Sequence, residues 1–278
     1  MKKTKLLIFG VLAVLLAGCG NNQATSKKDT TTDSTTTSAK KESKKKHTNS
    51  NSSSSASSTD KKNDQTKSDT TTTNLTRLQQ LNNELTKALG QVILPQVDGL
   101  SNADHDKVNV RYIGDNRNYS IYYSLGYNAY PFNDEHLKQH VPYAVLSKKT
   151  YDTQAQAREN IHYFDVTQSQ DLPKVDLGYK IEGVLDSGAG QSYLQWNEGN
   201  WSLSVHASAY NGQETIPTGR QIVSLLEQQM LPAPNDRGSF AVDMTTNEVT
   251  LTWMKENIVY TLEGKDVNTL VSMAASLK

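Results

Sequence analysis

Hydrophobic and polar positions follow three patterns along the chain. Residues 6–16 are apolar without interruption, residues 20–74 contain no Ile, Leu, Val, Met, Phe, Tyr or Trp, and apolar residues return with regular spacing from residue 75 on. A segment without large apolar side chains cannot offset the entropy lost on folding. The pattern therefore predicts one folded region, residues 75–278, long enough for one domain or for two small sub-units, 75–175 and 176–278.

The folded region opens with a predicted amphipathic helix in the stretch "NLTRLQQLNNELTKALGQ". Leucines recur there at spacings of three and four, which places them on one helical face. Asn74 can cap the start of this helix, and Gly90 marks its end. We expect the leucine face to pack on the core rather than to form a zipper with a partner.

A β-hairpin is predicted next, in "VNVRYIGDNRNYSIYYSLGY", because two alternating runs flank the turn signal "GDNRN". Tyrosines crowd this region. Aromatic rings on a strand usually pack across strands, but a dense cluster can also line a groove for a sugar or an apolar ligand. Both interpretations stay open, and Tyr112, Tyr122 and Tyr123 are candidate ligand-binding residues. Further on, "YAVLSKKTY" predicts a strand, and "DTQAQARENIHYF" predicts a helix capped by Asp152.

The chain contains an internal sequence repeat. The runs "YLQWNEGNWSLSV" and "TLTWMKENIVYTL" align without a gap, and each reads as strand, polar turn and strand followed by an amphipathic helix. Two ββα units are therefore predicted. Together the elements favour an α+β fold, an antiparallel sheet of hairpins with helices packed on one face. The aromatic residues of these hairpins are further candidates for ligand binding: Trp196, Trp201, Trp253 and Tyr260.

Composition changes the picture at the N-terminus. Three lysines precede the apolar run, and residues 6–18 supply only thirteen apolar or small residues, whereas a membrane-spanning helix needs about 20. Residues 1–18 therefore read as a secretory signal peptide.

The residues at the end of that segment, Leu16, Ala17, Gly18 and Cys19, resemble the lipobox of bacterial lipoproteins. The resemblance implies that the Cys19 thiol carries diacylglycerol and that cleavage leaves Cys19 as the new N-terminus. Cys19 is the chain's single cysteine, so it has no disulfide partner within the chain. Two or more acyl chains hold a protein stably on a membrane. We expect a lipid-anchored protein on the extracytoplasmic face of the cell membrane.

Residues 19–74 are predicted to be the lipidated cysteine and a disordered tether. Of the 55 residues from 20 to 74, 26 are Ser or Thr, and ten lysines against six acids give this segment a net charge of +4. The lysines either contact anionic lipid or wall polymer, or only keep the tether solvated. Residues 75–278 hold 16 basic and 23 acidic residues, a net charge of −7. Nucleic acid is not an expected partner, because the chain is exported.

The C-terminal stretch from residue 231 to 278 is similar to the closing module of uncharacterised surface lipoproteins of Gram-positive bacteria. The residues that carry this resemblance are a Trp in a hairpin, a "Y-x-L-x-G" motif and an "A-x-S-L" ending, here Trp253, Tyr260, Leu262, Gly264, Ala274, Ser276 and Leu277. The resemblance implies surface location and fold, and no particular activity. The ββα style is also similar to periplasmic lipoprotein carriers and sigma-factor regulatory sensors.

Motifs for catalysis are not found in the sequence. The chain lacks G-x-S-x-G, and "DSGAGQS" reads as a turn. His136 and His140 have helical metal-site spacing, but Leu137 stands where a zinc protease carries its glutamate. We therefore predict no enzyme, no metal and no cofactor other than the covalent lipid.

Three hypotheses of function follow, in this order. A module that binds a small or apolar ligand or an envelope component predicts an exposed aromatic groove. An interaction or scaffold protein that regulates an envelope complex predicts an exposed apolar patch. A hydrolase predicts convergent Asp, Glu or His residues with perturbed pKa values in a cleft.

Overall fold

The computed structural model describes residues 75–101, 104–169 and 171–278. The predicted signal peptide, Cys19, the predicted tether and Asn74 lie outside the described residues. Within these ranges no helix combines the length and apolar character needed to cross a membrane.

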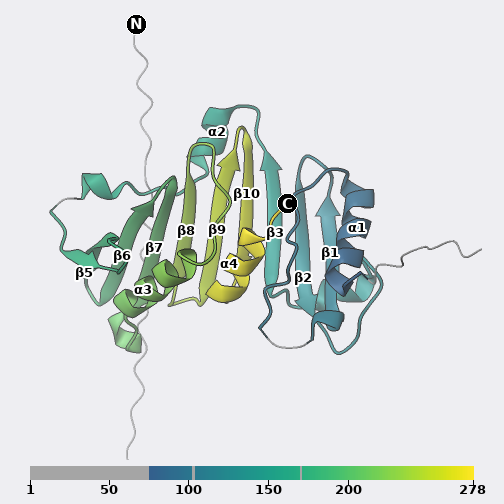
Figure 1. The fold of residues 1–278 in the computed structure, drawn as a ribbon, viewed down its shortest axis with the longest axis horizontal. Coiled ribbons are helices and arrows are strands. Elements are labelled where there is room, and N and C mark those ends of the chain that lie inside the picture. Colours follow the sequence, from purple (N-terminus) through teal and green to yellow (C-terminus); the bar gives the residue numbers. More distant parts are fainter. Residues whose placement is uncertain (1–74, 102–103, 170) are drawn as a thin grey trace, which may run out of the picture. The chain divides into compact units, whose positions relative to one another are not determined.

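The described residues form a ten-stranded sheet with the order β1-β2-β3-β10-β9-β8-β7-β6-β5-β4 (Figure 1). Every neighbouring pair is antiparallel except β7 and β8, which are parallel. The α+β class and the mostly antiparallel sheet are thus confirmed. The strands are β1 Val108–Gly114, β2 Tyr119–Leu125, β3 Ala144–Thr150, β4 Lys174–Asp176, β5 Glu182–Gly188, β6 Gln191–Glu198, β7 Trp201–Ser208, β8 Gly238–Asp243, β9 Glu248–Lys255 and β10 Ile258–Gly264. The α-helices are α1 Arg77–Leu89, α2 Gln154–Glu159, α3 Thr215–Leu226 and α4 Val267–Ala275.

One face of the sheet carries the core, because apolar residues alternate with polar ones along most strands. Strand register places one apolar residue from each of seven consecutive strands in a single row, and all of these side chains are at most 1% exposed. This row is Trp196, Leu203, Phe240, Leu251, Leu262, Leu146 and Ile121. Burial of each side chain contributes roughly 1.5–3 kcal/mol. The same core cluster includes residues on both sides of position 175, so the described domain has one continuous core of its own.

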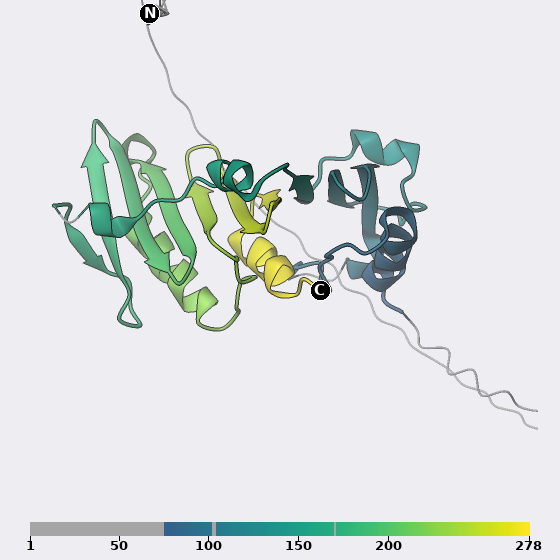
Figure 2. The same cartoon turned by 90° about the horizontal axis from the view of Figure 1, so that it is seen from above.

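Three helices cover the core face, and the fourth lies on the opposite face (Figure 2). The leucines of α1 join the core cluster, α3 packs on β6 and β7, and α4 packs on β9 and β10. In contrast, Ala157 of α2 packs with Ile161 against Met254 and Val259 on the other face. The expectation of helices on a single face is corrected for α2. Because β3 lies beside β10, the chain must cross the sheet to reach β4, and it does so over the face that the other helices leave free.

Two helix starts are set by capping boxes. Thr76 caps α1 with Gln79 in place of the expected Asn74, and Thr153 caps α2 with Gln156 in place of the expected Asp152. In each box the threonine oxygen accepts from the backbone of the third helical residue, whose glutamine side chain accepts in return. α2 ends at Glu159, earlier than the sequence indicates, because Ile161 leaves the helix to pack on the sheet.

The two segments of the internal repeat form hairpins with the same register. Trp196 pairs with Leu203 in β6–β7, and Trp253 pairs with Tyr260 at the aligned positions of β9–β10. A third strand precedes each hairpin, β5 in one case and β8 in the other, and α3 and α4 follow. Each unit is therefore a three-strand meander followed by a helix.

Candidate binding cavity

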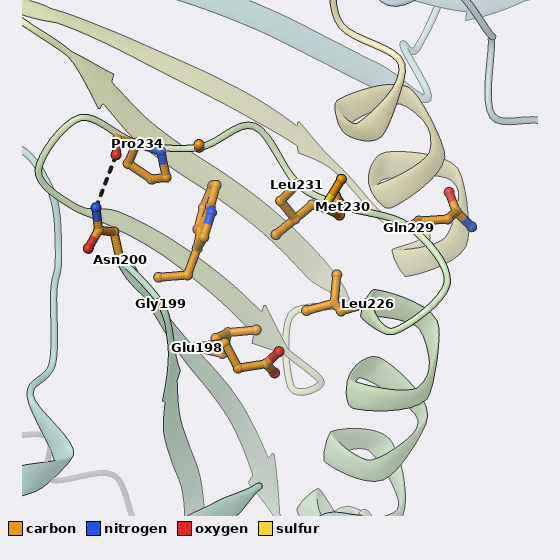
Figure 3. A pocket seen from close by; sticks show the side chains of 11 residues that line it. Glu198, Gly199, Asn200, Leu226, Gln229, Met230, Leu231 and Pro234 are labelled. Atoms are coloured by element: carbon orange, nitrogen blue, oxygen red, sulfur yellow. Dashed lines mark hydrogen bonds between the residues drawn. The ribbon is translucent and has the colours of Figure 1, made fainter. Parts of the chain in front are cut away.

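A cavity of about 420 Å³ lies between the β6–β7 turn, the C-terminal end of α3 and the segment 227–237 that leads to β8. Ligand sites in proteins commonly measure about 300–1,000 Å³. Figure 3 shows Leu226 at the end of α3, and Leu231 and Pro234 on the connecting segment, across from Glu198 of the hairpin. The lining is mostly apolar, and Glu198 is its one ionisable residue.

Hydrogen bonds hold the connecting segment over the hairpin. The Asn200 side-chain amide donates to the Pro234 carbonyl at 3.1 Å, and the Trp201 indole N–H donates to the Pro232 carbonyl at 3.1 Å. At the start of β8, the Gly238 N–H donates to the Asn200 carbonyl at 2.8 Å. The turn itself is tight, since Gly199 adopts a left-handed φ of 54°. These hydrogen bonds between protein groups hold the walls of the cavity in place without a ligand.

Trp201 forms a fixed wall of the cavity. Its side chain is 7% exposed, and its ring packs directly on Gly238, where a Cβ atom would lie 2.7 Å from the Trp201 ring. Gly238 is paired in register with both Trp201 and Trp253, and the ring centroids of these two residues lie 6.4 Å apart. Glycine at position 238 is therefore required for the indole to occupy this position.

Glu198 provides the charge of the cavity. Its Oε1 accepts a hydrogen bond of 2.7 Å from the buried indole N–H of Trp196. Partial burial raises the pKa of Glu198, the Trp196 hydrogen bond opposes this, and the nearby charge of Glu227 raises the pKa further. No basic side chain among the described residues forms an ion pair with this carboxylate.

Met230 lies at the rim of the cavity with 87% of its surface exposed. Methionine is unbranched and polarizable, so it adapts to the shape of what it contacts. The cavity thus combines a fixed aromatic wall with one adaptable side chain at its opening.

The aromatic residues singled out from the sequence occupy different places. Four of them, Tyr123, Trp196, Trp253 and Tyr260, are at most 5% exposed and lie in the core. Trp253 stacks on Tyr260 with centroids 5.5 Å apart, and Trp201 completes this row and alone reaches the cavity. Tyr112 stacks on Phe132, and Tyr122 lies under the Arg111 guanidinium at 3.5 Å on the opposite face of the sheet.

A cluster around His206 is not indicated by any motif in the sequence. The imidazole stacks on Tyr193 with centroids 4.2 Å apart, its Nδ1 lies 3.2 Å from Oδ2 of Asp243, and its Nε2 lies 2.8 Å from Oε1 of Gln191. The hairpin register that pairs Tyr193 with His206 follows from the "GN" turn and was available in the sequence. Asp243 was not, because it arrives through the parallel pairing of β7 and β8.

His136 and His140 make contacts with nearby residues of the same segment. His136 Nδ1 lies 2.6 Å from Oδ1 of Asp134, and both imidazoles contact the ring of Tyr130. In the part of the chain that the structure describes, no group of three His, Cys, Asp or Glu side chains is placed to hold a metal ion.

Comparison with known proteins gives no relative on which to base a function. No protein-family model matches the chain, and searches of curated proteins and of solved structures find no match. The cavity and the sequence motifs therefore provide the basis for a function.

Gly238→Ala should disturb the cavity wall. The added methyl group meets the Trp201 ring, so we expect a loss of about 1–3 kcal/mol in the free energy of unfolding and a shift of the tryptophan emission spectrum. Urea unfolding and fluorescence of a protein comprising residues 20–278 would measure both. Gly188→Ala is the matched control, since a Cβ atom there meets nothing within 4 Å and the free energy should stay within about 0.5 kcal/mol. Equal behaviour of the two variants would contradict the role of Gly238.

The stability of the fold should depend on Asp243 at acid pH. Burial raises the pKa of Asp243, but hydrogen bonds from the Thr245 side chain, His206 and the backbone of Thr245 and Thr246 outweigh burial and lower it to about 2. A lowered pKa in the folded state stabilises the fold above the unfolded pKa of about 3.9, and this contribution is lost as the pH falls through about 2.

The free energy of unfolding of Asp243→Asn should therefore be lower than that of the wild type above about pH 4, and the difference should narrow toward pH 2. Urea unfolding at pH values from 6 to about 2 measures it. Asp186→Asn on β5 is the control. A wild-type advantage that stays constant across this range would rule out the linkage.

Proposed function

We propose that the chain is a lipid-anchored cell-surface lipoprotein whose non-enzymatic extracytoplasmic domain binds a small ligand with a large apolar part. The observation that carries this proposal is the preformed cavity beside Trp201. Its size suits a small molecule, and its lining of Leu, Met, Pro and Trp side chains favours apolar surface.

The lining residues support binding rather than catalysis. A hydrolytic site needs a nucleophile and a base within hydrogen-bond reach of each other. The cavity lining contains Glu198 but no Ser, Thr, Cys, His or Lys. At the second ionisable cluster, both ring nitrogens of His206 are already engaged by Asp243 and Gln191.

The same proposal includes the internal repeat: β6–β7–α3 and β9–β10–α4 are two copies of one ββα unit. Shared register and the turn asparagines Asn200 and Asn257 support it, since each carbonyl accepts an N–H from a neighbouring segment at 2.8 Å. The copies differ where the cavity lies. Lys255 and Ile258 occupy the positions that Glu198 and Trp201 occupy in the first copy.

Anchorage through Cys19 and a disordered tether over residues 20–74 completes the proposal. A flexible coil of this length spans on the order of 40 Å. The membrane is then a partner only through the lipid, and the acidic domain, with its net charge of −7, samples the space outside it.

A second candidate is an interaction protein that regulates an envelope complex. It is favoured by the exposure of Leu125 at the end of β2 and of Tyr127 and Val141 in the β2–β3 connection, where Tyr127 is 96% exposed. Gly126 lies close to the ring of His140, so the two ends of this connection are neighbours.

The ligand-binding proposal is tested with N-phenyl-1-naphthylamine, a neutral apolar dye that fluoresces when it leaves water. Residues 20–278 should bind it, and Trp201→Ala should weaken binding at least about tenfold, because the variant loses a large wall contact. Leu231→Ala is a milder variant of the same wall and should weaken binding less. Tyr193→Ala, on the opposite face of the sheet, should leave it unchanged. Absence of dye binding to the wild type, or equal binding by the Trp201 variant, would refute the proposal.

Lipid attachment is tested by Cys19→Ser in a bacterial host fed labelled palmitate. The variant should lose the label and leave the membrane fraction, because the thioether needs the cysteine sulfur. A double variant, Cys19→Ser with Ser26→Cys, keeps one thiol at the wrong place and should also stay unlabelled. Label on either variant would show that the lipid is not at Cys19.

A further inference from the structure

Glu198 is a carboxylate where a neutral acceptor would serve the fold. The buried Trp196 indole N–H needs one acceptor, and Oε1 of Glu198 supplies it at 2.7 Å. A glutamine oxygen would meet this need without a charge, and a partly buried charge is costly unless a partner of opposite sign pairs with it. The second oxygen of Glu198 has no hydrogen-bond or ion-pair partner among the described residues.

The surroundings of this carboxylate lack a compensating cation. Glu227 lies close enough to act on Glu198 through its negative charge. Basic residues are absent from the cavity lining, and the folded region as a whole carries a net charge of −7. The electrostatic potential at the cavity therefore favours positive charge.

The remaining lining matches a cation joined to an apolar body. Figure 3 shows the carboxylate of Glu198 on the side that faces Leu226 of α3. The Trp201 ring belongs to the lining, and aromatic rings attract ammonium groups. Leu226 and Leu231 offer apolar surface for the rest of the molecule.

We propose that the ligand is a small organic cation, an ammonium group on an apolar body, with its charge received by Glu198. This inference rests on the proposed function, because it names the ligand class of the same cavity. A bare metal ion is a poor occupant, since one carboxylate is the only charged ligand that the lining provides. An organic anion would meet the repulsion of Glu198 and Glu227.

Three molecules of nearly equal shape test the charge: 4-phenylbutylamine, 4-phenylbutan-1-ol and 4-phenylbutanoate. Calorimetric titration of residues 20–278 at pH 7 should show the amine bound about tenfold or more tightly than the alcohol, as a hydrogen bond to a charged group implies, and the carboxylate bound most weakly. Glu198→Gln should remove the difference between amine and alcohol while keeping the affinity for the alcohol, which shows that the variant is folded. Glu214→Gln, at the other end of α3, controls for the change in net charge.

The outcomes separate this inference from the proposed function. Equal affinities for amine and alcohol in the wild type would overturn the cationic ligand and leave the binding cavity standing. A preference for the amine that survives in the Glu198→Gln variant would overturn the role of Glu198. Failure of the neutral dye to bind would overturn the proposed function itself, whereas dye binding together with failure of all three molecules would overturn the cationic ligand alone.

Discussion

The parallel pairing of β7 and β8 is the constraint on which the cavity depends. Antiparallel neighbours can be joined by a short turn, but parallel neighbours need a crossover. Here the crossover is α3 and the segment 227–237, which returns the chain to the end of the sheet where β7 began. The cavity is the space between this returning segment and the β6–β7 turn. The same pairing brings Asp243 beside His206, so both unusual features of the domain come from one junction.

The second hairpin shows what the junction adds. β10 is followed in the sheet by β3, which is antiparallel to it, so no crossover returns past the β9–β10 turn. The Asn257 carbonyl instead accepts the N–H of Tyr151, where the chain leaves β3 for α2. Two hairpins of equal register thus have different neighbours, and the cavity forms beside the first. Similar local sequence gives a similar hairpin, and the position in the sheet decides what surrounds it.

Local patterns predicted local structure well and tertiary neighbours poorly. The leucine spacing of α1 correctly indicated a helix, and the alternation in the two repeated runs correctly indicated hairpins, because these signals depend on nearby residues. The pairings of β3 with β10 and of β7 with β8 join segments distant in sequence, and no periodicity reports them. The candidate site shows the same division. Trp201 was singled out as an aromatic residue, whereas Glu198 and the 227–237 segment carried no motif. They become part of the candidate site only because the fold brings them together around the cavity.

The segment 227–237 is built to keep the cavity open. Pro232 and Pro234 have restricted backbones, and their carbonyls accept the bonds from Trp201 and Asn200. The Asn235 N–H donates to the Met254 carbonyl at 3.2 Å, which adds an attachment to the second unit of the sheet. Met230 between these attachments and α3 stays in solvent. The proposed ligand would then find most of the cavity already ordered. Because ordering of a site subtracts from affinity, fixed walls with one exposed side chain at the rim are consistent with the proposed recognition of a small molecule.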